Sequence, residues 1–341
     1  MSNFGGQKRA LFARERPLTS RERALATRLD LLSRSYAAAI DQRDPIRLAA
    51  SFERPEDREV AAWIASTFAY GRVDTILATV GRLLASLGPR PAQALDRISD
   101  YPRFAREELL GFRHRFHSAR DAAALLYAIS RARNQAGSAR AFFEREYRPE
   151  ERDVGGLLSR TVDCIVSLDW RPALGRRALA DDSPVRFFFP SPASGSACKR
   201  WNLYLRWMVR KDAMDFGLWG AIPTSRLVIP TDTHVHRVAR RLGLTRRRAA
   251  DWKTAREITD RLARFDPMDP VRYDYALCEL GTIGICRPVL AESLCAQCSL
   301  NVACPAGRRR LTSDTPLLPS RALRLRSGQA PRGISPIGTA A

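Results

Sequence analysis

The chain has 341 residues, enough to bury one large core or two smaller ones without stabilisation by disulfides. Its 57 Lys and Arg exceed its 36 Asp and Glu, so the formal net charge is +21, and this surplus favours a polyanionic partner such as nucleic acid. No apolar run approaches the length of a membrane span, and the first residues lack the apolar core of a signal peptide. We therefore expect a cytoplasmic, nucleoid-associated protein with no membrane partner.

Apolar residues at helical spacing recur along most of the chain. Ser20 is placed to cap the first expected helix, and the acidic pair Glu56 and Asp57 opens the second. In chain order, we expect helices at 20–32, 56–68, 73–87, 119–134, 138–146, 154–168, 198–210 and 233–242. No segment has the pattern of a long strand. The predicted fold class is therefore all-α.

Prolines, glycines and serines interrupt this pattern at 89–91 and 181–195, which are expected to be loops between helices. After Ala306 the chain is rich in Arg, Pro, Ser and Gly and has little apolar periodicity. Residues 307–341 are therefore expected to form a disordered basic tail.

Four cysteines near the end of the helical region are spaced like metal ligands. They are Cys286, Cys295, Cys298 and Cys304, with eight, two and five residues between neighbours. Paired zinc sites usually have two separate Cys-x-x-Cys knuckles, whereas this segment has one such pair flanked by single cysteines. The asymmetry favours a [4Fe-4S] cluster. A four-cysteine zinc site and unligated buried thiols are the alternatives, and Cys278 is the substitute ligand if one of the four is mis-assigned.

Two polar side chains stand at the start of expected helices. Asp232 precedes helix 233–242, where a carboxylate accepts hydrogen bonds from free backbone amides and the positive helix end keeps it ionised. Lys199 begins helix 198–210 beside Arg200, and a positive field raises the neutral, nucleophilic fraction of an amine. A simple cap and a solvated lysine are the structural interpretations. A catalytic acid and an imine-forming amine are the chemical ones.

These features occur in the order of a known superfamily: Lys199 after a turn, Thr-Asp-Thr-His-Val-His-Arg-Val at 231–238, and the four-cysteine segment. The chain resembles the helix-hairpin-helix base-excision DNA glycosylases. Over residues 225–306 it is similar to endonuclease III and its adenine-glycosylase relatives, whose first cysteine gap is slightly shorter. The segment 57–80 is similar in character to their barrel helices.

The sequence departs from that superfamily at the hairpin. Endonuclease III has Leu-Pro-Gly-x-Gly-x-Lys-Thr-Ala, whereas residues 189–199 read Phe-Pro-Ser-Pro-Ala-Ser-Gly-Ser-Ala-Cys-Lys, with one glycine and an added segment. The separation of Lys199 from Asp232 is closer to that of the archaeal 8-oxoguanine glycosylases, which have an altered hairpin. The whole pattern looks most like an uncharacterised bacterial family of unknown function.

The resemblance implies two helical domains with a cleft between them. On this basis residues 1–44 contribute an N-terminal helix that packs with the cluster domain, 45–222 form a helical barrel with the modified hairpin, and 223–306 form the domain with Asp232 and the iron-sulfur cluster.

The resemblance also implies roles for single residues. Lys199 attacks the sugar C1′ of a flipped nucleotide, and Asp232 stabilises the developing oxocarbenium charge. The residues expected to line the base pocket or to wedge the duplex open are Phe216, Trp219, Tyr70 and Arg72. The residues expected on the DNA backbone are Gly195, Arg200, Arg237 and Arg240. For the aromatic residues, burial in the core is the alternative interpretation.

The resulting hypothesis is a monomeric DNA base-excision glycosylase that acts on a lesion in a duplex, with or without a β-lyase step, and carries a [4Fe-4S] cluster. One alternative is a non-catalytic iron-sulfur module that binds nucleic acid on the same scaffold. The other is a glycosidase that acts on RNA or on a free nucleoside.

Overall fold

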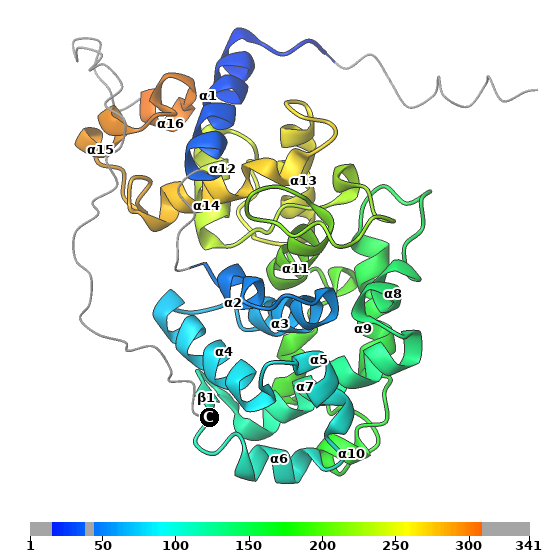
Figure 1. Cartoon of the computed structure of the whole chain (residues 1–341). Helices are drawn as coiled ribbons and strands as arrows, with labels where there is room; N and C mark the ends of the chain where they lie inside the picture. The colour runs from blue at the N-terminus through cyan, green and yellow to red at the C-terminus, as the bar shows by residue number, and fades with distance from the viewer. Residues whose placement is uncertain (1–15, 38–43, 309–341) are drawn as a thin grey trace, which may run out of the picture.

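The computed structural model describes residues 16–37 and 44–308, and this part of the chain is mostly helical, as the all-α prediction requires (Figure 1). The tail is expected to start at residue 307, but Gly307 and Arg308 belong to the last described helix; the rest of the expected tail, 309–341, lies outside the described residues. The helices are α1 Ser20–Ala37, α2 Ile46–Ala50, α3 Pro55–Thr67, α4 Val73–Leu87, α5 Pro91–Arg97, α6 Tyr101–Glu107, α7 Ala119–Ala136, α8 Ala139–Glu144, α9 Gly155–Val166, α10 Arg171–Leu174, α11 Lys199–Val209, α12 Thr233–Leu242, α13 Trp252–Ala263, α14 Asp274–Thr282, α15 Glu292–Gln297 and α16 Pro305–Arg308.

Short elements connect these helices. Two strands, β1 Arg113–His114 and β2 His117–Ser118, pair antiparallel in a small hairpin. Within the described residues, short 3-10 helices are η2 Pro184–Phe188, η3 Pro192–Ser194, η4 Thr224–Arg226, η5 Pro270–Tyr273 and η6 Asn301–Ala303.

Local capping explains where several helices begin. Ser118 and Asp121 form a reciprocal capping box at the start of α7, and Asp251 accepts a hydrogen bond from the Thr254 amide at the start of α13. The helices expected from periodicity are present, with ends shifted by a few residues. The pattern does not predict α5 and α6, because each has a proline as its first or second residue in a segment that looks like a loop.

Helix α3 lies at the centre of the molecule. Its Trp63 packs against Phe143 of α8 and against Trp201 and Tyr204 of α11, with ring centroids 5.1, 5.7 and 5.7 Å away. These aromatic contacts fix α11 against α3 and so determine where the first residue of α11, Lys199, emerges.

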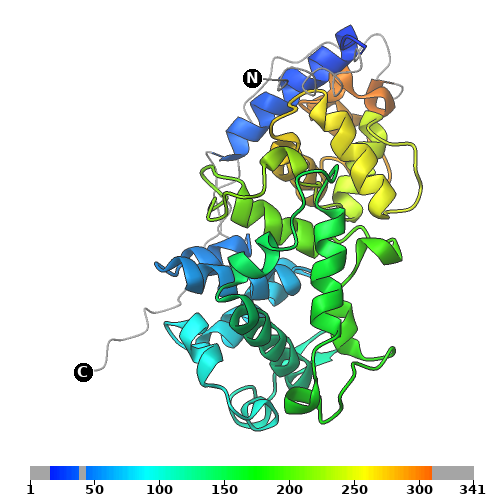
Figure 2. The same cartoon turned by 90° about the vertical axis from the view of Figure 1, so that its right-hand side faces the viewer.

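Both views show an elongated body with α1 and α12–α16 at one end, α4–α7 and α10 at the other, and α2, α3 and α11 between them (Figures 1 and 2). Helix α12 packs against α14, and α1 packs against α14 and η6. The buried apolar side chains nevertheless form one continuous cluster from Leu25 to Ala303. None of the described helices combines the length and apolarity needed to span a bilayer.

Candidate active site

Lys199 follows a tight turn at the start of α11. Cys198 has a left-handed backbone with φ 48°, which is uncommon for a residue with a side chain. Two contacts hold this turn: the Cys198 amide donates to Ser196 Oγ at 3.1 Å, and its buried thiol lies 3.5 Å from the Pro190 carbonyl. Burial raises the pKa of that thiol to about 12, so it stays protonated. The turn therefore directs Lys199 away from the core that receives the rest of α11.

Asp232 caps α12 as the sequence predicts. Its Oδ1 accepts hydrogen bonds from the amides of His234 and Val235 at 2.8 and 2.9 Å. The preceding segment 227–231 is buried, which fixes the entry of the chain into the helix. The other carboxylate oxygen, Oδ2, takes no part in capping and faces α11.

The structure brings the two predicted catalytic side chains together. Lys199 Nζ lies 3.4 Å from Asp232 Oδ2, and the side chains are 32% and 18% exposed, so solvent reaches both. Nζ also donates to the Ala69 carbonyl at 3.2 Å, between α3 and α4. Three parts of the chain far apart in sequence therefore meet at one amine. A nucleophile, an acid and a backbone acceptor within one contact distance can perform a covalent reaction with proton transfer.

Beneath this pair, α14 contributes two residues that sequence reasoning did not assign to the site. Asp274 is buried, and burial raises its pKa to about 7, against the opposing effect of Arg206. The charges of Asp232 and Lys199 also act on Asp274. Burial, followed by the charges of Asp232 and Asp274, raises the pKa of the Cys278 thiol. The sequence carries no signal for either residue, because each reaches the site only through the packing of α14 on α12.

The placement of Cys278 also bears on its suggested role as a substitute metal ligand. The charged groups that act on its thiol are Asp232, Asp274 and Lys199, and its sulfur lies 3.8 Å from the Thr282 hydroxyl. Cys278 therefore belongs to the floor beneath Lys199 and Asp232.

Two of the predicted DNA contacts need correction. Arg200 is only 9% exposed, its guanidinium donates to the Thr67 and Phe187 carbonyls, and burial lowers its pKa to about 10. It is a buried structural arginine and does not present a phosphate-binding group. Trp219, expected in a base pocket, is 2% exposed, and its Nε1 donates to Glu59 Oε1 at 2.9 Å. It is part of the aromatic core around α3.

The other aromatic and wedge candidates fall in two places. Phe216 is half-buried near Arg58, whose guanidinium lies 5.5 Å from the ring, and its amide donates to the Trp207 carbonyl near the far end of α11. It does not reach the start of that helix. Tyr70 directly follows Ala69, the acceptor of the Lys199 amine, and Arg72 is exposed just beyond it. These two lie beside Lys199.

The remaining backbone candidates differ in accessibility. Gly195 is exposed at φ 83°, ends η3, and its carbonyl accepts from the Trp252 amide at 3.0 Å. Arg240 is exposed on α12. Arg237 is half-buried, and its guanidinium binds the Cys286 carbonyl at 2.9 Å and His234 Nδ1 at 3.0 Å. Arg237 therefore connects α12 to the four-cysteine loop.

The four predicted ligands lie in the segment that packs against α12. Arg241 Nη1 donates to Cys286 Sγ at 3.1 Å, and Cys304 Sγ lies 3.6 Å from the Arg241 carbonyl and 3.3 Å from the Gly307 amide. Burial raises the pKa of the Cys298 thiol to about 11. A backbone hydrogen bond from Leu300 lowers this pKa, whereas the charges of Cys304, Cys286 and Cys295 raise it further. The other three cysteines therefore act electrostatically on the Cys298 thiol.

These residues fit a thiolate-bound group in their chemistry. Arginine and backbone N–H groups already point at two of the sulfurs, and such donors stabilise the negative charge of cluster thiolates. In the described part of the chain, no three His, Cys, Asp or Glu side chains form a group that could hold a metal ion. The residue types match a thiolate-bound group, but the positions of their side chains do not form a metal site.

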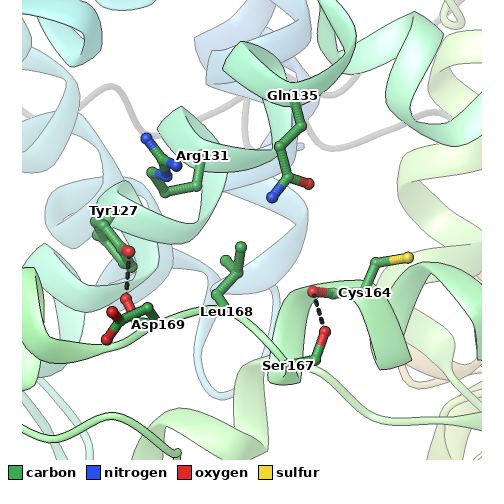
Figure 3. A pocket seen from close by; sticks show the side chains of 7 residues that line it. All are labelled: Tyr127, Arg131, Gln135, Cys164, Ser167, Leu168 and Asp169. Atoms are coloured by element: carbon green, nitrogen blue, oxygen red, sulfur yellow. Dashed lines mark hydrogen bonds between the residues drawn. The ribbon is translucent and has the colours of Figure 1, made fainter.

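A pocket of about 260 Å³ lies elsewhere, between the end of α7 and the segment after α9 (Figure 3). The Tyr127 hydroxyl donates to the Asp169 carbonyl at its edge, and the Ser167 hydroxyl donates to the Cys164 carbonyl. None of the site residues predicted from the sequence lines this pocket.

The chain belongs to the family described as a protein of unknown function (DUF2400), whose family model matches residues 44–283. The matched region includes Lys199 and Asp232 and ends just before Cys286. No curated protein and no solved structure matches the chain.

Proposed function

We propose that the protein is a DNA base-excision glycosylase in which Lys199 is the nucleophile and Asp232 its acidic partner. The observation that carries the proposal is the 3.4 Å approach of Lys199 Nζ to Asp232 Oδ2 at a site open to solvent. The net charge of +21 suits a polyanionic substrate. The arrangement of lysine, aspartate and four cysteines in the chain resembles the helix-hairpin-helix glycosylases, which supports the same chemistry.

In the proposed mechanism, the two Asp232 oxygens have different roles: Oδ1 caps α12 and Oδ2 faces the Lys199 amine. Oδ1 accepts hydrogen bonds from the α12 amides, so the carboxylate is held in a fixed orientation. Oδ2 is free to take a proton from the Lys199 ammonium. The bond from C1′ of an extruded nucleotide to the base breaks first, and its electron pair leaves with the base, which is protonated by solvent. The ionised Asp232 stabilises the oxocarbenium-like transition state of this step. Nζ then transfers a proton to Oδ2 as it forms a bond to C1′.

The C1′–O4′ bond then breaks as the nitrogen lone pair forms a double bond to C1′, and the proton lost from nitrogen ends on O4′. The ring-opened sugar holds an imine between Nζ and C1′. Loss of a proton from C2′ expels the 3′ phosphate and nicks the strand, and water releases Lys199. Asp232 can return its proton at this stage. In this proposal Asp274 is a buried acid beneath the pair that sets its electrostatic environment, and it does not touch the substrate.

The proposed architecture has a cleft between residues 45–222 and residues 223–306, with Lys199 on the first wall and Asp232 on the second. The exposed Arg240 on α12 and the turn at Gly195 are the proposed contacts to the DNA backbone. Arg237 does not contact DNA in this proposal, because its guanidinium binds the Cys286 carbonyl and so connects α12 to the four-cysteine loop.

We assign a [4Fe-4S] cluster to Cys286, Cys295, Cys298 and Cys304, with zinc as the alternative. When bound, the metal centre cross-links the C-terminal loop, and its role is structural. Arg241 connects this loop to α12 by its contact with Cys286 Sγ, so that the loop braces the helix that carries Asp232.

The test uses a DNA duplex that contains one abasic site, because its C1′ aldehyde reports an imine-forming amine without knowledge of the lesion. The amine condenses with the aldehyde and loses water, and borohydride reduces the imine to a stable secondary amine. The chain has only four lysines, Lys8, Lys199, Lys211 and Lys253. We expect a covalent adduct in the wild type and its loss in Lys199→Ala.

The matched control is Lys253→Ala. Lys253 is exposed and, like Lys199, stands in the first turn of a helix, α13, but it has no aspartate opposite its amine among the described residues. Retention of the adduct in Lys199→Ala, or its loss in the control, overturns the assignment of the nucleophile.

A further inference from the structure

A cluster of aromatic side chains lies next to Lys199. We call Tyr70, Phe116 and Phe187 the aromatic platform. The Phe116 and Phe187 ring centroids are 5.0 Å apart, and the Tyr70 ring is 4.9 Å from Phe187 and 6.2 Å from Phe116. Phe116 is 52% exposed and Phe187 is 41% exposed. Large aromatic rings that contact one another at the surface are costly to leave in water, so this exposure indicates a binding surface.

Two histidines hold the platform in place. His117 Nε2 lies 3.0 Å from the Pro184 carbonyl, which can only accept, so Nε2 carries the proton. Its Nδ1 therefore accepts from the Tyr70 hydroxyl at 2.5 Å. His114 Nε2 likewise donates to the Tyr70 carbonyl at 3.0 Å. Burial lowers the pKa of both histidines, so the support is uncharged near neutral pH and does not repel a cationic rim.

The rim of the platform is basic. Arg72, Arg113 and Arg115 are all exposed, and no ion pair joins any of them to a described acidic residue. Arg115 bends over Gly71, because its Cδ lies 3.4 Å from where a Gly71 side chain would begin. Beneath the rings, the Arg200 guanidinium stacks 4.1 Å from Phe187 and 5.3 Å from Tyr70.

Two acidic residues near the rings are engaged, whereas Asp74 and Asp182 in the adjoining segments are exposed. Asp121 accepts from the Ser118 amide and hydroxyl in the capping box of α7, and Asp181 pairs with Arg186 at 3.0 Å. The three exposed arginines of the rim outnumber Asp74 and Asp182, so the charge around the rings is positive on balance. Exposed π faces within a basic rim match a chain of phosphates and bases, because bases stack on aromatic rings while arginines hold the backbone.

The platform adjoins the Lys199 amine, because Tyr70 and Arg200 directly follow the two residues of the hydrogen bond between Lys199 and Ala69. Lys199 Nζ donates to the carbonyl of Ala69, and Tyr70 is the next residue. Arg200, which follows Lys199, stacks on two of the three platform rings. A base stacked on the platform therefore lies beside the amine that attacks its sugar.

From this geometry we propose that the aromatic platform binds unpaired nucleotides of single-stranded DNA by stacking, and that the substrate of the Lys199 site is an unpaired stretch in preference to a closed duplex. This inference rests on the proposed function for its consequence at Lys199, but its binding claim stands on the platform alone. Phe116 and Phe187 are the stacking side chains, and Arg72, Arg113 and Arg115 contact phosphates.

The test measures binding of a fluorescein-labelled single-stranded DNA oligonucleotide by anisotropy, with a closed duplex of the same sequence for comparison. We expect tighter binding of the single strand by the wild type. Phe116→Ala and Phe187→Ala each weaken single-strand binding roughly 5- to 150-fold, the range for the loss of one stacked base. Phe116→Trp retains a π face and keeps the affinity, whereas Phe116→Leu retains only apolar area and loses it.

Met268→Ala is the matched control, since Met268 is also a large exposed apolar residue, 71% exposed, but lies before η5. We expect the Met268→Ala variant to bind single-stranded DNA with the wild-type affinity. Arg115→Ala weakens binding and reduces the slope of log K against log salt by about 0.7, the value for one phosphate of a single strand. Phe116→Ala leaves that slope unchanged, because stacking releases no counterions.

Several results overturn the proposal: equal affinity for single strand and duplex, unchanged binding in the Phe116→Ala/Phe187→Ala double variant, or a change of oligomeric state in that variant without a change in DNA binding. The abasic-site adduct separates this failure from that of the glycosylase. Adduct formation with an inert platform overturns only the inference. Loss of single-strand binding in the double variant, with no adduct in the wild type, overturns only the proposed reaction.

Discussion

Arg206 connects α11 to α14 through a buried ionic network, and its removal gives a quantitative test of how the site is supported. Its guanidinium pairs with Asp274 and lies 3.3 Å from Asp215 Oδ1. The three side chains are 5%, 6% and 1% exposed. Removal of one partner from a buried ion pair leaves an uncompensated charge and costs about 3–5 kcal/mol. We expect Arg206→Met to lower the free energy of unfolding by this amount, a large part of the 5–15 kcal/mol typical of a domain.

The loss of unfolding free energy in Arg206→Met should depend on pH, and the pKa shifts give its direction. Burial raises the pKa of Asp274 to about 7 and raises that of Asp215 as well. An acid whose pKa is higher when folded binds more protons in the folded state, so its contribution to stability falls as the pH rises through that window. Without Arg206 both carboxyl pKa values rise further. The destabilisation is therefore largest at about pH 8 and smaller at about pH 5, where Asp274 is already protonated.

The assay is urea unfolding of wild type and Arg206→Met at both pH values, followed by circular dichroism. Arg152→Met is the control, because Arg152 pairs with Asp260 at the surface and such pairs contribute less than about 1 kcal/mol. A loss in Arg206→Met no greater than in the control, or an equal loss at both pH values, would refute the view that this network holds α14 under the site.

Two further predictions concern the site itself. Asp232→Asn keeps the side-chain size and one capping oxygen, so we expect DNA binding to persist while base release falls by about 100-fold or more; turnover near the wild-type rate in a glycosylase assay excludes Asp232 from the reaction. Cys298→Ser should remove the visible absorbance of an iron-sulfur cluster and lower the stability of the α12–α16 region, as measured after anaerobic purification. A colourless wild type that contains zinc identifies the other metal, and a wild type with neither metal removes the metal centre from the account.

The predictions from sequence succeed where the physics is local. The cap at Asp232 follows from a carboxylate before an apolar-periodic segment, and the structure has both amide hydrogen bonds. Helix α4 begins and ends where its apolar period predicts. Such features depend on residues within one or two turns, so a single sequence is enough to find them.

Features that depend on distant partners could not be predicted in this way. Trp219 looks like an exposed loop residue, but its indole is held by Glu59, 160 positions earlier. Arg200 looks like a helix-start cation, yet carbonyls on two separate segments enclose it. Asp274 enters the site only because α14 packs on α12. The pairing of Lys199 with Asp232 was expected from the family resemblance, since residue spacing alone gives no distance between the two.

The most direct test of the central claim is peptide mapping of the borohydride-reduced adduct formed with an abasic-site duplex. The account predicts that the sugar remnant is attached to the Lys199 side chain, on the amine that faces Asp232. Attachment to Lys8, Lys211 or Lys253, or the absence of any adduct from protein that binds the same DNA, contradicts it.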